Sequence, residues 1–156
     1  MVLRLKWFIT CNRVASKMTF TSEEIDFTLK QKLKVRNWLT HIIKSYGFKL
    51  SALNFIFCND DYLLKINIDY LNHNTLTDII TFDNSEEENT IEGDIFISID
   101  RIRENASIFK VSFETELLRV LSHGTLHLLG FKDKNPKDKK EMTSKEDECL
   151  KLWGIE

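Results

Sequence analysis

The sequence predicts an α+β domain, in which helices pack on a small mixed sheet of about four strands. Segments rich in aromatic and β-branched residues are interspersed with longer segments of helical periodicity. The pattern supports only one early strand–helix–strand crossover, which disfavours a regular parallel α/β fold. The chain has 156 residues, 42% of them hydrophobic, and is therefore long enough for one domain with a single sizeable core.

Composition restricts the class of protein. The formal net charge of −2 gives no global signal for nucleic acid, so any RNA contact would need a local basic patch. Cys11, Cys58 and Cys149 are widely spaced and odd in number, which indicates neither a disulfide framework nor a cysteine zinc site. We interpret them as reduced thiols of a cytoplasmic protein. Apolar runs of transmembrane length are absent, so we expect no membrane association.

Residues 1–17 differ from the rest of the chain. They carry four basic residues and no acid, and their apolar run is too short for a secretory signal. We interpret residues 1–17 as an extension upstream of a native start at Met18, and residues 18–156 as the single domain. A weak targeting segment and an additional packed strand are the alternatives.

The first half of the domain is expected to contain two strands and two helices. Thr28 is a candidate N-cap for a helix that continues to about Tyr46 and ends at Gly47. Lysines and an arginine cover one face of this helix, which we interpret as a solvated surface rather than a phosphate contact. The other expected elements are strands at Thr19–Thr21 and Leu50–Cys58, and a helix from Asn59 through Tyr70.

The second half is expected to contain one clear strand and three helices. Residues 83–92 are acidic and polar and predict an exposed hairpin loop. The nearly continuous apolar run at 91–99 predicts a strand that is buried on both faces. Helices should follow, capped by Ser98 or Asp100, then by Ser112, and finally by Asn135 with proline at the first helical position.

The strongest chemical signal is a pair of histidines, His123 and His127, in the helix that follows Ser112. At about 3.6 residues per turn, their spacing stacks both imidazoles on one helix face. Gly130 suits the left-handed position that ends many helices, and the chain can then turn back to offer Asp133. Three such ligands leave a fourth position open, which is typical of a catalytic rather than a structural zinc ion. The alternative is a pair of hydrogen-bonded core histidines without a metal.

The residue after the first histidine excludes one class of zinc enzyme. Zinc metallopeptidases of the His-Glu-x-x-His type carry their general base there, and this chain has Gly124. Glycine has no side chain that could transfer a proton. A peptidase of that type is therefore not expected.

The motif His-Gly-x-Leu-His-Leu-x-Gly-Phe, residues 123–131, resembles the signature of the YbeY family. The members of this family are metal-dependent endoribonucleases of ribosomal RNA maturation. The family's third histidine corresponds to Asp133 here, which is still an acceptable zinc ligand. A second stretch, residues 67–82, matches the family at Thr77 and Asp78, but Leu71 stands in the place of the family's arginine. The resemblance covers roughly residues 18–153.

The resemblance implies a single-strand-specific, metal-dependent endoribonuclease that acts in 16S ribosomal RNA 3′-end maturation and ribosome quality control. One Zn²⁺ ion would be held by His123, His127 and Asp133. The expected partners are ribosomal RNA and the ribosome or ribosomal proteins. A non-catalytic ribosome assembly factor with a structural metal and a metal hydrolase of small phosphoesters are the alternatives.

Further site residues follow from the same comparison and from their charge. Asp78 is the candidate for a general base or for a residue that supports a metal ligand, and the alternative is a turn aspartate bonded to its own backbone. The basic residues near the site are predicted RNA contacts; they are Lys132, Lys134, Arg101 and Arg103. His41 and His73 receive no role.

Overall fold

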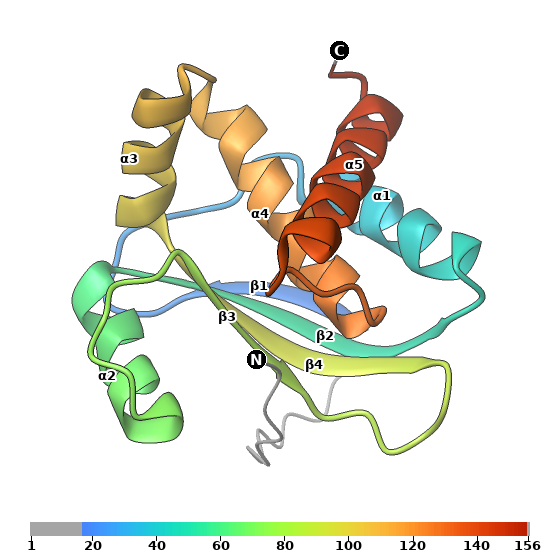
Figure 1. The fold of residues 1–156 in the computed structure, drawn as a ribbon, viewed down its shortest axis with the longest axis horizontal. Coiled ribbons are helices and arrows are strands. Elements are labelled where there is room, and N and C mark those ends of the chain that lie inside the picture. The colour runs from blue at the N-terminus through green and yellow to red at the C-terminus, as the bar shows by residue number, and fades with distance from the viewer. Residues whose placement is uncertain (1–16, 156) are drawn as a thin grey trace.

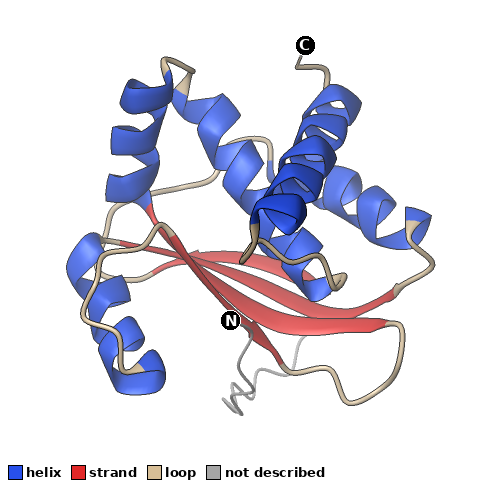
Figure 2. Ribbon diagram, in the orientation of Figure 1, coloured by secondary structure: helices blue, strands red, loops and turns tan. Residues whose placement is uncertain are grey.

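The structure, a computed structural model, describes residues 17–155. It confirms the α+β class: five helices accompany a four-stranded mixed sheet (Figures 1 and 2). In chain order the elements are β1 Met18–Ser22, α1 Lys32–Ser45, β2 Lys49–Cys58, α2 Asp60–Leu71, β3 Ile79–Asp83, β4 Thr90–Ser98, α3 Ile99–Phe109, α4 Phe113–Leu128 and α5 Pro136–Trp153. The prediction that residues 1–17 form an extension lies almost wholly outside the described residues.

The sheet has the strand order β1-β2-β4-β3. Strand β2 pairs in parallel with both β1 and β4, while β3 pairs with β4 in antiparallel orientation. The predicted acidic loop joins β3 to β4 as a hairpin. This arrangement places β3 at an edge of the sheet, with its first residue next to the end of the adjacent strand, where Ile79 is paired with Ile97.

Helices cover the two faces of the sheet unequally. Helices α1, α3, α4 and α5 lie on one side, whereas α2 lies on the other (Figure 1). The larger core is formed on the first side, and its fully buried side chains include Phe55, Ile95 and Leu121. A smaller cluster on the opposite face joins Leu63 of α2 to Phe82 of β3. Together the two clusters hold β3 between α4 and α2.

Helix α4 is the central helix, and it lies between α3 and α5 in Figure 1. Ten of its sixteen residues are buried, which a surface helix with a single apolar stripe does not show. The Ser112 hydroxyl accepts a hydrogen bond from the Thr115 N–H and caps the helix. The negative charge of Glu114 in the first turn interacts favourably with the positive end of the helix dipole. Figure 2 shows α4 between its neighbouring helices and the sheet. Its orientation therefore determines where its two histidines lie.

Two expectations about individual elements are corrected. Helix α1 begins at Lys32, not after Thr28. Strand β4 alternates between buried and partly exposed side chains, with Glu92 exposed, so it is not continuously buried on both faces. The caps predicted at Ser98, Ser112 and Asn135 are confirmed by hydrogen bonds from their side chains. Within residues 17–155, no helix has the length and apolarity needed to cross a membrane.

Candidate metal centre and active-site cavity

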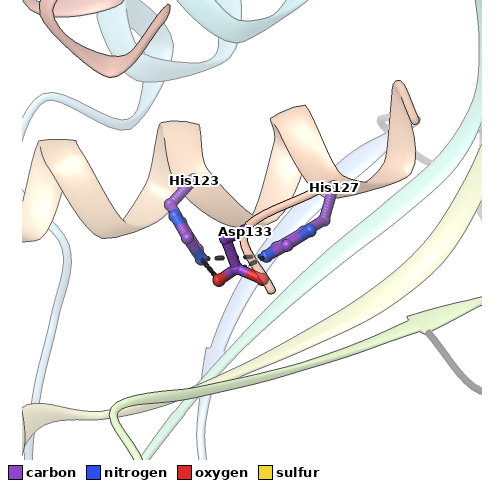
Figure 3. Close-up of side chains that lie close together, drawn as sticks. All are labelled: His123, His127 and Asp133. Carbon is purple, nitrogen blue, oxygen red and sulfur yellow. Dashed lines mark hydrogen bonds and ion pairs between the residues drawn. The ribbon is translucent and has the colours of Figure 1, made fainter. Parts of the chain in front are cut away.

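The side chains of His123 and His127 on α4 converge with that of Asp133, which lies in the loop after α4, as Figure 3 shows. The Nε2 atoms of His123 and His127 lie 3.0 Å apart. Gly130 has a φ of +99°, and the left-handed turn at this residue redirects the chain. Asp133 Oδ2 consequently lies 3.6 Å from His123 Nε2 and 3.5 Å from His127 Nε2.

The hydrogen bond of each outer ring nitrogen, Nδ1, determines where the proton lies on each imidazole and leaves the inner nitrogen, Nε2, facing the other ligands. His127 Nδ1 lies 3.0 Å from the carbonyl oxygen of Phe131, which can only accept, so Nδ1 carries the proton. His123 Nδ1 lies 2.7 Å from Glu146 Oε1, and a carboxylate likewise requires a proton on Nδ1. In the neutral rings both Nε2 atoms therefore present lone pairs toward each other and toward a carboxylate oxygen. Three acceptors that converge without a donor form a site suited to a cation.

The donor set fits a single Zn²⁺ ion. Zinc binds histidine nitrogen and carboxylate oxygen at about 2.0–2.2 Å in tetrahedral sites, which separates ligand atoms by roughly 3.3 Å. The separations of 3.0, 3.5 and 3.6 Å bracket that value. Among the described residues, His123, His127 and Asp133 are the group of potential ligands whose atoms lie close enough together to hold one metal ion. A mixed nitrogen and oxygen set also accepts other divalent transition metals.

Burial and charge shift the pKa values of the two imidazoles in opposite directions. For His123, burial lowers the pKa, but the hydrogen bond to Glu146 and the charges of Glu146 and Asp133 outweigh burial and raise it overall. For His127, burial lowers the pKa, and the neighbouring His123 lowers it further. Such a split is expected of two rings so close that both cannot be charged.

The three candidate ligands lie in the wall of a cavity of about 440 Å³. The opposite wall is formed by the end of α2, the loop that follows it and the start of β3. The Asn67 side chain holds this loop in place, because it is only 3% exposed and donates a hydrogen bond of 2.7 Å to the Thr75 carbonyl oxygen. The lining residues are Asn67, Leu71, His73, Thr75, Leu76, Thr77, Asp78, Ile79, Ile80, Thr81, His123, His127, Asp133 and Lys134.

The structure brings some of the predicted site residues into this cavity. Asp78 and Lys134 line it together with the three candidate ligands. The Asp78 carboxylate accepts a hydrogen bond of 3.4 Å from the side chain of Asn105, which lies on α3 and not in the turn that contains Asp78. The base or support role of Asp78 and the RNA contact of Lys134 remain predictions that this placement allows.

Other predicted RNA contacts lie elsewhere. Lys132 lines a separate hollow of about 300 Å³ beside Gly130. Arg101 forms an ion pair of 2.9 Å with Asp60, and Arg103 lies 3.7 Å from Asp100. An RNA contact by either arginine stays a prediction. The guanidinium would have to break its ion pair with the aspartate or contact the RNA phosphate and the aspartate at the same time.

Sequence reasoning missed three residues around the centre. Glu146 of α5 is 8% exposed and contacts His123, and its sequence signal is an acid within the otherwise apolar stripe of that helix. Glu116 of α4 is 3% exposed, and its Oε2 is without a hydrogen-bond partner among the described residues. Burial raises the pKa of Glu116; the charge of Arg119 opposes this increase, and the charges of Asp78 and Glu146 add to it. His73, which received no role from the sequence, lines the cavity.

The chain is similar to known proteins over most of its length. Residues 17–154 match the family model described as "Endoribonuclease YbeY". A protein named endoribonuclease YbeY from Cytophaga hutchinsonii is 50% identical over 133 residues, which are 85% of this chain and 93% of that protein. A protein of the same name from Flavobacterium psychrophilum is 52% identical over 132 residues, which are 85% of this chain and 94% of the relative.

A solved structure is also similar. The solution structure of TM1509 from Thermotoga maritima has a TM-score of 0.61 and 28% sequence identity, and the match covers 87% of this chain and 88% of that one. The fold and the site thus define an α+β protein whose cavity carries a donor set suited to a divalent cation. The family match spans nearly the whole described chain. The chain belongs to the YbeY endoribonuclease family.

Proposed function

We propose that this protein is a metal-dependent endoribonuclease that cleaves single-stranded RNA during ribosomal RNA processing. The proposal extends to maturation of the 16S ribosomal RNA 3′ end and to ribosome quality control in the cytoplasm, with ribosomal RNA as substrate and the ribosome as partner. Its support is the family membership together with the cavity that holds the three candidate ligands. RNA is the natural substrate class because the relatives carry the name endoribonuclease.

His123, His127 and Asp133 would hold one Zn²⁺ ion. A bound divalent cation supplies Lewis acidity for a phosphate oxygen and for a water molecule. Asp78 lines the same cavity and offers a carboxylate that can accept a proton from water. Lys134, also in the wall, offers a positive charge to an RNA phosphate. These roles divide binding, proton acceptance and charge stabilisation among different elements of the fold.

The single observation that carries the metal proposal is the convergence of three acceptors. Two imidazole Nε2 lone pairs and a carboxylate oxygen face one another within 3.6 Å. In the alternative, a pair of core histidines without a metal, one Nε2 atom would have to carry a proton and donate it to the other. The ring would then be doubly protonated, because each Nδ1 atom already donates its proton to Glu146 or to Phe131.

Cleavage of RNA by the purified, zinc-loaded protein tests the proposal directly. We expect cuts in single-stranded segments of a ribosomal RNA precursor, and loss of cleavage in a His127→Ala variant. The matched control is His41→Ala, because His41 is exposed on α1 and is not among the lining residues of the cavity. A wild-type protein with stoichiometric zinc that binds but does not cut RNA would instead support the ribosome assembly factor.

A separate competition distinguishes the third candidate function. A chromogenic phosphodiester reports hydrolysis of small substrates. Single-stranded RNA should inhibit this hydrolysis at low concentration if RNA is the substrate of the same cavity. Rapid hydrolysis of the diester that RNA does not inhibit would support a hydrolase of small phosphoesters.

A further inference from the structure

Helix α5 contributes a buried carboxylate to the metal centre. Glu146 lies on the inward stripe of α5 with Met142, Cys149 and Leu150, and its Oε1 accepts from His123 Nδ1 at 2.7 Å. It is 8% exposed, so its charge is largely removed from solvent. An isolated carboxylate in such a place is strongly unfavourable and must be paired.

The second carboxylate oxygen is also occupied. Glu146 Oε2 lies 3.2 Å from Arg119 Nη1, and the same Nη1 atom lies 3.1 Å from Asp147 Oδ1. Arg119 lies on α4, one helical turn before His123. The carboxylate is therefore fixed at both oxygens by groups of α4, and its orientation does not depend on α5 alone.

The two candidate histidine ligands consequently have different supports. His127 donates its Nδ1 proton to the neutral carbonyl of Phe131, whereas His123 donates to a charged carboxylate. Hydrogen bonds to charged acceptors are stronger than those between neutral groups. A carboxylate on the outer nitrogen also makes the inner nitrogen a better electron donor to a metal.

We propose that Glu146 is a positioning residue that holds His123 with its proton on Nδ1 and thereby couples the docking of α5 to metal binding. Arg119 orients Glu146 for this role. The inference rests on the metal site of the proposed function and extends it to a helix outside the histidine motif. Docking of the C-terminal helix and metal affinity would then change together.

A purely structural tether between α4 and α5 is the competing explanation, and paired variants separate the two. Glu146→Ala removes both the contact with His123 and the ion pair with Arg119. Arg119→Met removes the ion pairs with Glu146 and Asp147, but it keeps the aliphatic stem and leaves the contact between Glu146 and His123. Glu146→Gln keeps an oxygen that can accept from His123 Nδ1 but removes the charge.

The first measurement is the Zn²⁺ dissociation constant, obtained by competition with a chelator. Loss of a residue that supports a metal ligand typically weakens metal binding by about 10–100-fold. We expect a loss in this range for Glu146→Ala, a smaller loss for Glu146→Gln and the smallest for Arg119→Met. Equal losses for the alanine and methionine variants would overturn the proposal in favour of the tether.

The second measurement uses the metal-free protein and requires no activity. Long-range ¹H–¹⁵N correlation spectra report which ring nitrogen of His123 carries the proton. We expect the Nδ1–H form in the wild type and in Glu146→Gln, and a shift toward the Nε2–H form in Glu146→Ala. Glu146→Gln keeps the test decisive if the alanine variant does not fold, because loss of the Nδ1–H form in the glutamine variant would also refute the proposal.

Failure of the inference differs from failure of the proposed function. A wild-type protein that binds no Zn²⁺ would refute the metal site and this inference with it. A wild-type protein that binds Zn²⁺ while Glu146→Ala binds it equally tightly would refute the inference alone. The proposed endoribonuclease activity would then stand without a role for α5.

Discussion

Replacing Asp133 with alanine should weaken zinc binding and leave the fold intact. Its carboxylate is the only oxygen among the three candidate ligand atoms. The side chain is 35% exposed, so its removal creates no buried cavity. The turn that carries it is held by the backbone conformation of Gly130 and by the contact between His127 Nδ1 and the Phe131 carbonyl oxygen. Loss of the ligand is therefore separable from loss of the fold.

The expected magnitude follows from the ligand role. Removal of a group that merely supports a ligand costs about 10–100-fold in affinity, so removal of a ligand should cost at least about 100-fold. Zinc at about 1,000 times the wild-type dissociation constant stabilises the fold by about 4.1 kcal/mol, and at about 10 times by about 1.4 kcal/mol. With roughly 2–4 °C per kcal/mol, zinc should raise the Tm by roughly 8–16 °C in the wild type and 3–6 °C in Asp133→Ala.

Thermal unfolding with and without zinc is the assay. Asp133→His should restore most of the zinc-dependent increase in Tm, because imidazole nitrogen is also a zinc ligand. Asp69→Ala is the control, since Asp69 is exposed on α2 and does not line the cavity. If zinc raises the Tm of Asp133→Ala as much as that of the wild type, the carboxylate is not a ligand and the assignment is wrong.

Three further predictions concern charge and chain length. A Lys132→Ala/Lys134→Ala double variant should bind single-stranded RNA more weakly and keep its zinc, and its slope of log affinity against log salt should be shallower by about 0.7 per lost phosphate contact. If neutralisation of Lys30, Lys32 and Lys34 around the start of α1 reduces the slope and the double variant does not, RNA binds on the α1 surface instead. Glu116→Gln should raise the Tm at pH 7. Burial raises the pKa of Glu116 in the folded state, so the fold loses stability as the pH rises from the ordinary carboxyl pKa through the raised value. A glutamine at this position cannot ionise and avoids this loss. The gain should be on the order of 1 kcal/mol at pH 7 and vanish below about pH 4 in thermal unfolding, and a lower Tm at pH 7 would contradict it. A chain that begins at Met18 should have a Tm within a few degrees of that of the full-length chain. Among the described atoms it loses one backbone hydrogen bond, which Leu53 N–H donates to the Lys17 carbonyl oxygen. A decrease of many degrees would show that residues 1–17 pack on the core.

The histidine pair and its aspartate were predictable because their geometry is local. Helical periodicity alone places His123 and His127 one turn apart. Gly130 supplies the turn that returns the chain within three residues, so Asp133 reaches the histidines without help from distant elements. Glu146 was not predictable in this way, since the packing of α5 on α4 brings it to His123 from 23 positions along the chain. Its one local signal was an acid in an apolar stripe.

The start of α1 shows how tertiary contacts override a local signal. Thr28 is a suitable N-cap residue, yet the helix begins four residues later, after Gln31 in a left-handed conformation. The Phe27 ring packs against Phe57 at 4.9 Å between ring centroids and against Phe113 at 6.1 Å. The Ser22 hydroxyl also donates to the Phe27 carbonyl oxygen. These contacts hold the segment outside the helix, and short-range propensity does not contain them.

Gly124 explains why the histidine motif of this family member differs from that of the zinc peptidases. A Cβ atom at this position would lie 2.8 Å from Ile79 Cδ1 and 3.0 Å from Ile95 Cγ2. Glycine therefore allows α4 to approach the sheet closely. A glutamate at this position would push α4 away from the sheet. That approach brings the histidine face of α4 to the start of β3, where Asp78 immediately precedes Ile79. The position that carries a base in the peptidases is a packing position here. In the proposed reaction a proton acceptor would therefore come from a neighbouring element, and Asp78 in the cavity wall is our candidate.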